Sequence, residues 1–471
     1  MAYADAIRPV RNSLRKFSYV SVLQRLSEYI HRTSTQKSST LQAPWVAERL
    51  VLWAVRDNPS LYRHEVMQLS DLQKSLNLAW NGMDTEFQWF SHDAPLTLSV
   101  RSLLLAQIPH QVGQTTAPFV RQIDLVNRLQ PNSRLYATFE RELGMPPLDY
   151  LRIATLFRLN SAKDIGRVFT PNYRLELAGY FGEGSAQRFF DMLVVPREKT
   201  AAEMRKIDAD EWFQPNLMYR SPFTHYDNQW FYWGRCCLDR HLEYALSDIV
   251  GASGDPMVRQ MFESMFEAYV GRSLRRTGCI VLNEDEVRLR FNVVGGCCDF
   301  AVLEGDAVVL VEVKNKALAH TLPASAALRT YRSKLKATIM KAAEQLNNTA
   351  RAVRAAQPSA KIHRVTATYG DLLLGKPDYL FEQSDFADSV HIFCVDQLDQ
   401  LTEAVRLRQC TLESFFRDYI ERQTTPEKGM FSVSELLDEP PYQLPQAPRY
   451  IMDTFEPFLQ TMITRCAPEP S

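Results

Sequence analysis

A short run of residues, VVLVEVKNK (Val308 to Lys316), places charged side chains at alternate positions of an otherwise apolar segment. In a strand, alternate side chains share one face, so Glu312, Lys314 and Lys316 are expected together while the intervening valines point into a core. A carboxylate and two lysines on one face of an apolar strand are unusual unless they serve a polar site. The pattern therefore makes Glu312 and Lys314 candidates for acid–base or metal-assisted chemistry.

Asp299 stands upstream of Glu312, with twelve residues between them. Residues 299–303 and 307–316 predict two strands, and Glu304-Gly305-Asp306 predicts the turn between them. Such a hairpin brings the Asp299 carboxylate beside that of Glu312. Two carboxylates from neighbouring strands form a hard oxygen site suited to Mg²⁺, which can polarise a phosphate and lower the pKa of a bound water. A lysine nearby can stabilise charge on the phosphate, so the constellation fits phosphodiester hydrolysis.

The order of these residues resembles a known signature. Asp299, followed after twelve residues by Glu312-Val313-Lys314, is similar to the D-x(n)-(D/E)-x-K pattern of the PD-(D/E)xK superfamily, to which many restriction and repair endonucleases belong. Glu267 lies in a segment similar to the helix that often precedes the core hairpin, and the resemblance implies that its carboxylate joins Asp299 and Glu312 at the metal ion. Gln345 resembles the polar helix position that accompanies the ExK strand.

The resemblance covers about residues 261–346 and implies an α/β nuclease core, in which a central mixed sheet is flanked by helices. It implies a Mg²⁺-dependent endonuclease, with Mn²⁺ as a second usable ion, that hydrolyses phosphodiester bonds and for which DNA is the favoured substrate. Cys298 departs from the pattern, because it stands where the superfamily's name has proline. The catalytic residues that the resemblance implies are Asp299, Glu312, Lys314 and Gln345.

The biological setting stays open at this point. Nucleases of this type with an added helical domain are common in bacterial antiphage and mobile-element defence, which makes antiphage activity one expectation. A first alternative is a non-catalytic nucleic-acid-binding or sensor module that keeps the nuclease fold, and a second is an RNA-cleaving toxin. The N-terminal region would recognise a target or a protein activator, or restrain the nuclease, and a homodimer is compatible with the superfamily.

The elements that position these residues follow from hydrophobic periodicity. Up to about residue 238 the pattern is mainly helical, with helices predicted at 46–55, 96–108 and 134–143. Beyond it we predict further strands at 287–292, 363–369 and 391–395, and helices at 328–353 and 397–406. The predicted divisions are a mainly helical recognition or regulatory region at 1–238, a nuclease domain at 239–410, and a helical and Pro-rich appendage at 411–471.

Basic residues concentrate directly after the ExK strand. Between Lys314 and Arg364 there are eleven lysines and arginines against one acid, Glu344, although the whole chain has a formal net charge of -1. A net charge of +10 beside the candidate site is typical of a surface that binds a phosphate backbone, since solvated faces usually mix the two signs. The residues that we expect to bind nucleic acid are Lys316, Arg329, Arg332, Lys334, Lys336 and Lys341.

Nine aromatic residues lie between Trp212 and Trp233. They have two interpretations, a base-stacking surface for single strands or a hydrophobic interface inside the protein, and the second is favoured. The eight cysteines include no CxxC spacing, and the N-terminus has no stretch of signal-peptide type. We therefore expect a cytoplasmic protein with reduced thiols, no membrane segment and no structural zinc.

Overall fold

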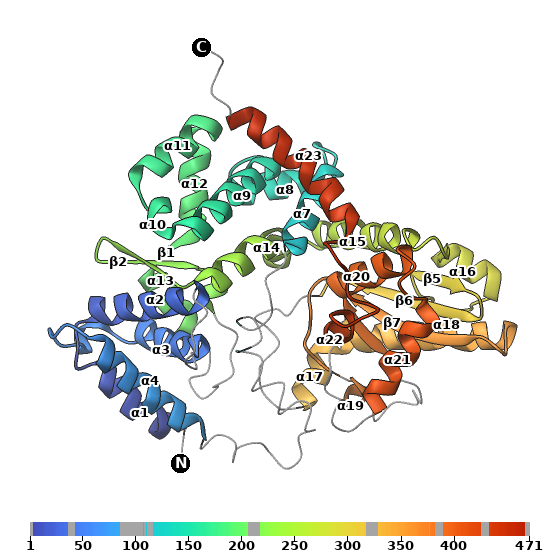
Figure 1. Ribbon diagram of the computed structural model, residues 1–471, viewed down its shortest axis with the longest axis horizontal. Coiled ribbons are helices and arrows are strands. Elements are labelled where there is room, and N and C mark those ends of the chain that lie inside the picture. Colours follow the sequence, from blue (N-terminus) through green and yellow to red (C-terminus); the bar gives the residue numbers. More distant parts are fainter. Residues whose placement is uncertain are drawn as a thin grey trace.

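The computed structural model of the chain describes residues 3–35, 43–84, 107, 110, 116–205, 217–316, 328–375, 377–381, 390–424 and 433–466. Helices form most of the protein. Figure 1 shows a helical part, which holds the N-terminal half of the chain, beside a part built around a sheet. The predicted combination of a mainly helical N-terminal region and a central mixed sheet flanked by helices is confirmed at this level.

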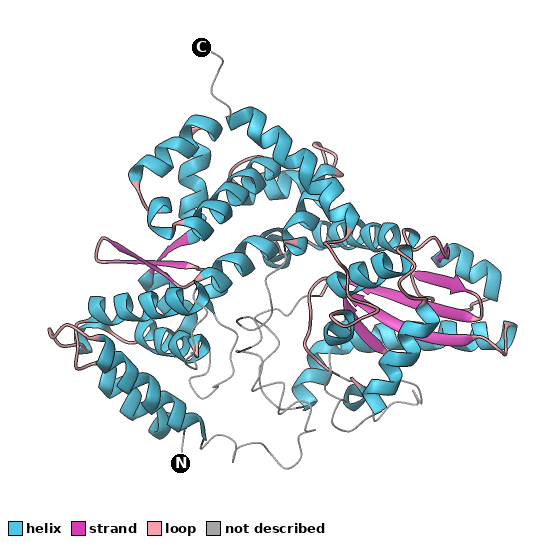
Figure 2. Ribbon diagram, in the orientation of Figure 1, coloured by secondary structure: helices cyan, strands magenta, loops and turns pink. Residues whose placement is uncertain are grey.

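Five strands form the central sheet in the order β4-β5-β6-β7-β8 (Figure 2). Pairing is antiparallel from β4 to β6 and parallel from β6 to β8. The hairpin between β5 and β6 turns at Gly305, whose φ of 58° lies in the left-handed region that glycine adopts without strain. The strands are β4 (Ile280–Asn283), β5 (Phe300–Glu304), β6 (Ala307–Lys314), β7 (Lys361–Thr368) and β8 (His391–Cys394).

Strand β6 is buried on both faces, and its side chains alternate between two hydrophobic cores. The odd-numbered valines from Val309 to Val313 belong to one core, whereas Val308 and Leu310 belong to the other. Helices close both faces, so this part has three layers. The first core is closed by α15 (Pro256–Arg275) and α20 (Val395–Arg406), and the second by α16 (Glu284–Phe291), α17 (Leu328–Leu335) and α18 (Lys341–Ala356).

The long helix predicted after the hairpin is confirmed. It consists of α17 and α18 joined by a π-helical turn at Lys336–Met340. Its apolar stripe faces the sheet, because helical side chains three or four positions apart lie on one side. The members of this stripe that are fully buried are Tyr331, Leu335, Ile339, Ala342, Leu346 and Val353.

The strand predicted at 287–292 is wrong, because these residues lie in and just after helix α16. Asn283 begins the helix by accepting a hydrogen bond from the Glu286 backbone N–H (3.0 Å), and the Glu286 carboxylate accepts from the Asn283 N–H (2.8 Å). This reciprocal capping box stabilises a helix start. The strand at this edge of the sheet is instead β4, which ends at the capping residue.

The N-terminal region is mainly helical, as predicted. The helix expected at 46–55 corresponds to α3 and that at 134–143 to α8, whereas the one expected at 96–108 lies outside the described residues apart from Gln107. A small sheet, β1 (Val194–Pro196), β2 (Phe223–Tyr226) and β3 (Gln229–Tyr232), stands among the helices. The helices described in this region are α1 (Tyr3–Leu14), α2 (Tyr19–Thr35), α3 (Pro44–Arg56), α4 (Leu69–Asp84), α7 (Ala117–Asn127), α8 (Arg134–Leu143), α9 (Pro147–Lys163), α10 (Ile165–Val168), α11 (Pro171–Phe181), α12 (Glu183–Leu193), α13 (Arg197–Arg205) and α14 (Arg235–Ala252).

Most of the described aromatics of the segment 212–233 pack inside the protein. Phe223, Phe231 and Trp233 are buried, and the Trp233 indole N–H donates to the Thr224 hydroxyl at 2.8 Å. This burial favours the interpretation of the segment as a hydrophobic interface. Trp212 and Phe213 lie outside the described residues, and Trp230 differs from the others because it is 37% exposed.

The C-terminal segment contains the predicted helix, α21 (Leu412–Thr424), a short α22 (Val433–Leu437) and an unpredicted helix, α23 (Arg449–Cys466). Helix α23 runs from the sheet-containing part to the helical part, where it packs along α7 (Figure 1). The cysteines whose side chains are described are free thiols. Among the described helices, none combines the length and apolarity needed to cross a lipid bilayer.

The contact between His363 on β7 and helix α21 should make the stability of the protein depend on pH. His363 stacks on Phe416 with ring centroids 4.4 Å apart, and burial lowers its pKa to about 4, with Glu413 opposing and Arg364 and Lys361 adding to the shift. Its charged form is therefore disfavoured in the folded state, so the contribution to stability is complete above pH 6.5 and is lost as pH falls toward 4.

His363→Phe keeps the stack and removes this titration. Between pH 7.5 and 5.5 the variant should lose about 1 kcal/mol less of its free energy of unfolding than the wild type, as measured by urea denaturation. His64→Phe, at an exposed position, controls for the loss of a histidine. An identical pH dependence of wild type and His363→Phe would contradict the prediction.

Candidate active site

The hairpin brings three of the four predicted catalytic side chains together. Asp299 lies directly before β5, and its Oδ2 accepts a hydrogen bond from the Val313 backbone N–H on β6 at 2.7 Å. On the same strand, the Lys314 ammonium donates to Glu312 Oε1. The side chain of Glu312 is 1% exposed and that of Lys314 is 20% exposed, so the lysine lies at the solvent side of the buried carboxylate.

The two carboxylates disfavour each other's charge. Burial raises the pKa of Glu312 to about 8, and the Asp299 carboxylate adds to this shift while Lys314 opposes it. Burial also raises the pKa of Asp299, although the hydrogen bond from Val313 and the charge of Lys314 act in the opposite direction. A cation bound between them would relieve both the desolvation and the repulsion.

Two further carboxylates act on this centre. Partial burial raises the pKa of Glu267 on α15, and the charges of Asp299 and Glu284 add to the shift. Glu284, the first residue of α16, also raises the pKa of Asp299 and of Glu312. Sequence reasoning missed Glu284, and the signal that could have found it is the Asn283-x-x-Glu286 capping pattern, which places Glu284 in the first turn of a helix.

The carboxylates present fit an Mg²⁺ ion. Oε2 of Glu312 is buried and receives no hydrogen bond from the part of the chain that the structure describes, which is costly for a carboxylate oxygen unless a cation or water contacts it. Within the described ranges, no three His, Cys, Asp or Glu side chains are grouped so that they could hold a metal by themselves. Mg²⁺ commonly takes one or two protein carboxylates and completes its shell with water and substrate phosphate, so Asp299 and Glu312 are a sufficient protein contribution.

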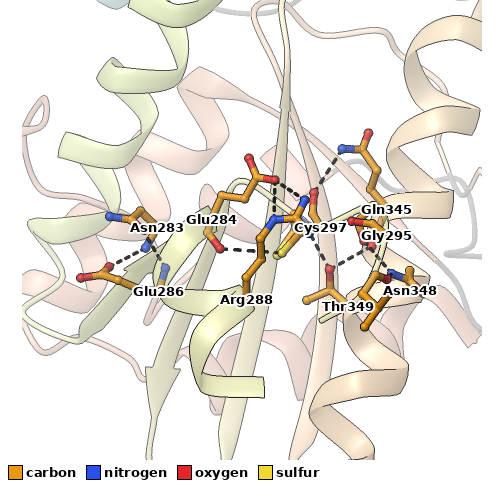
Figure 3. A network of polar contacts seen from close by, with 12 residues as sticks. Asn283, Glu284, Glu286, Arg288, Gly295, Cys297, Gln345, Asn348 and Thr349 are labelled. Carbon is orange, nitrogen blue, oxygen red and sulfur yellow. Dashed lines mark hydrogen bonds and ion pairs between the residues drawn. The ribbon is translucent and has the colours of Figure 1, made fainter. Parts of the chain in front are cut away.

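The loop that leads to Asp299 is held by polar side chains of α18 (Figure 3). Gln345 donates to the Cys297 carbonyl at 3.1 Å, and Asn348 donates to the Gly296 carbonyl at 2.7 Å. From the other side, Arg288 on α16 donates to the Gly295 carbonyl at 2.7 Å. Gln345, predicted as a catalytic residue, therefore contacts the backbone two residues before Asp299 and positions this loop.

The departure at Cys298 has a structural reason. Its backbone N–H donates to the Thr349 hydroxyl of α18 at 3.0 Å, and the Cys298 side chain is fully buried. A proline at this position would lack the N–H and could not make that bond. The thiol also donates to the Phe300 carbonyl at 3.3 Å, so the residue links the loop to both α18 and β5.

Thr349→Val tests this anchor. The substitution keeps the shape of a fully buried side chain but leaves the Cys298 N–H without an acceptor, which should cost about 1–3 kcal/mol of unfolding free energy. Chemical denaturation measures it. Thr338→Val is the control, because among the described residues the Thr338 hydroxyl donates to the Leu335 carbonyl of its own helix and holds no loop. Equal stability losses in the two variants would show that the hydrogen bond from the Cys298 N–H to Thr349 does not contribute to stability.

The predicted nucleic-acid-binding residues divide into two groups. Lys334, Lys336 and Lys341 are exposed along the helix that follows the site, and burial together with the charge of Lys334 lowers the pKa of Lys316. Arg332 instead donates to the carbonyls of Tyr379 (2.6 Å) and Leu380 (3.1 Å), so it holds a neighbouring segment. The side chain of Arg329 lies outside the described part of the chain.

Comparisons of the chain with protein-family models, curated proteins and solved structures return no match. The likeness to PD-(D/E)xK nucleases therefore depends on the residues and the local geometry described above.

Proposed function

We propose that this protein is a metal-dependent nuclease of the PD-(D/E)xK type that hydrolyses phosphodiester bonds, with DNA as the favoured substrate. The observation that carries the proposal is the meeting of Asp299, Glu312 and Lys314 at one hairpin, where no described residue donates a hydrogen bond to the buried Oε2 of Glu312. A buried carboxylate oxygen is stabilised when it has a partner, and a bound cation would supply one.

Asp299 and Glu312 would hold the Mg²⁺ ion, and Glu267, predicted as a third ligand, would add negative potential that attracts it. When bound, the ion supplies a polarised phosphate and a water of lowered pKa. Lys314 lies at the exposed edge of Glu312, where its ammonium can contact a phosphate oxygen and stabilise the charge that develops there.

The exposed lysines of the helix that follows the site are the proposed contacts for the phosphate backbone of the substrate. Lys334, Lys336 and Lys341 lie on the helix whose buried face packs on the sheet, so a phosphate backbone can follow their outer side. Contacts of this kind are electrostatic and bind without sequence preference. The N-terminal region is proposed to recognise the target or a protein activator.

The direct test offers circular, linear and single-stranded DNA, and RNA, to the full chain with Mg²⁺ or Mn²⁺, and again with EDTA. We expect DNA to be cut only when the metal is present. Cleavage of RNA alone would favour the toxin alternative. The absence of any cleavage, together with salt-sensitive binding of nucleic acid, would favour the non-catalytic binding module.

A further inference from the structure

A cavity of about 400 Å³ lies in the helical part, where residues of α10, α11, α12 and β3 line it. Three aromatic side chains, Phe169, Phe190 and Trp230, line one part of it, and aliphatic side chains line much of the rest. The Trp230 ring lies 5.9 Å from that of Phe169, at an interplanar angle of 70°, and 5.9 Å from that of Phe190, at 36°. The volume falls within the range of about 300–1,000 Å³ that is typical of small-ligand pockets.

The mouth of the cavity leaves large apolar side chains in solvent. Trp230 is 37% exposed and Leu175, on α11, is 69% exposed, whereas Phe190 on the inner wall is 4% exposed. Apolar surface gathered around a concave site commonly marks a place where a ligand binds. Trp230 is also the described member of the aromatic segment whose ring is least covered by the protein.

Polar groups at the rim narrow the class of ligand. Arg174 and Glu183 line the cavity, and both are exposed. An aromatic wall favours a flat ring, a guanidinium binds an anionic group in a bidentate manner, and a carboxylate accepts hydrogen bonds from ring N–H or amino groups. A nucleobase linked to a phosphate presents all three features, whereas a plain hydrocarbon would leave the two charged side chains unused.

We propose that this cavity binds a nucleotide, with its base stacked on Trp230 and its phosphate facing Arg174. The nucleotide is either free in solution or an unpaired unit of a nucleic-acid strand. The site lies on the helical part, away from the β5–β6 hairpin, so the proposal goes beyond the nuclease function and does not depend on it (Figure 1).

Isothermal titration of the full chain in EDTA, with AMP, adenosine and single-stranded oligodeoxyadenylate, tests the proposal. Trp230→Ala should weaken binding about tenfold or more, and Trp230→Phe should retain most of it. Arg174→Ala should weaken the binding of AMP and leave that of adenosine unchanged. Trp80→Ala is the matched control, because Trp80 is a similarly exposed tryptophan on α4 (39%).

Binding of AMP would identify the free nucleotide as a ligand, and Trp230-dependent binding of the oligonucleotide alone would identify the strand. Lys314→Ala should bind AMP as the wild type does, so a failure of the nuclease proposal would leave this result unaffected. The proposal is overturned if neither AMP nor the oligonucleotide binds. It is also overturned if wild type, Trp230→Ala and Arg174→Ala bind them equally. Arg174 is exposed, so its variant decides the matter even if Trp230→Ala fails to fold.

Discussion

Lys314→Ala is expected to lower the rate of metal-dependent cleavage by about 10²–10³-fold while the protein stays folded. The ammonium of Lys314 is the cationic group in contact with Glu312, and it is positioned to stabilise charge on a phosphate. Loss of one such electrostatic contact typically lowers kcat by about 10²–10³-fold. The fold should tolerate the change because Lys314 lowers the pKa of Glu312, so its removal raises this pKa further above neutral and leaves the buried carboxyl in its uncharged form.

The measurement compares initial rates of DNA cleavage by wild type and variant at saturating Mg²⁺, with circular dichroism and melting as checks of folding. Lys361→Ala is the matched control. Lys361 is exposed at the start of the neighbouring strand β7, where it pairs with Glu413, and its loss should leave cleavage unchanged. Wild-type rates in Lys314→Ala would mean that the observed cleavage comes from another site or from a contaminating nuclease.

The hairpin could be predicted because its signals are local. Strand β6 is a continuous apolar run interrupted only at the face that carries Glu312 and Lys314, and its turn contains a glycine that adopts a positive φ. The helix of α17 and α18 could be predicted for the same reason, since its buried residues repeat at helical spacing. Both elements are specified within a few residues, without help from distant parts of the chain.

The alternation of apolar and charged residues wrongly predicted a strand where helix α16 lies. Val287, Leu289 and Phe291 alternate with arginines, as residues of a strand do. The structure buries Val287 and Phe291, which are four residues apart, and leaves Leu289 88% exposed. The capping box at Asn283 decides between the two periods. Because the segment was predicted as a strand, Glu284 was not predicted as a residue near Asp299.

Helix α23 was missed for a different reason. Prolines precede it, and Pro457 lies inside it, which as a local signal argues against a helix. Its packing along α7 supplies stability that no local pattern reports. The Tyr450 hydroxyl also lies 3.2 Å from that of Tyr269 on α15, so the start of α23 contacts the helix that carries Glu267.

Asp299→Asn is expected to remove metal binding and cleavage without loss of stability. The asparagine carbonyl can still accept the hydrogen bond from the Val313 N–H, so the connection between β5 and β6 is kept. The negative charge that raises the pKa of Glu312 is removed, and the repulsion between the two carboxyls disappears. We expect cleavage to fall at least about 100-fold and the melting temperature without metal to stay equal or rise slightly.

Metal binding can be followed without any cleavage assay, because a ligand that binds the folded state raises the melting temperature as its concentration increases. Mg²⁺ should stabilise the wild type and Asp306→Asn, in which the substituted carboxylate is exposed at the turn of the same hairpin. Asp299→Asn should show little or no stabilisation over the same range of Mg²⁺. If Asp299→Asn is stabilised as strongly as Asp306→Asn, the cation does not bind at the hairpin, and the assignment of Asp299 as a metal ligand fails. If Asp299→Asn is neither stabilised by Mg²⁺ nor active while Asp306→Asn is both, the metal and the chemistry belong to the same pair of strands.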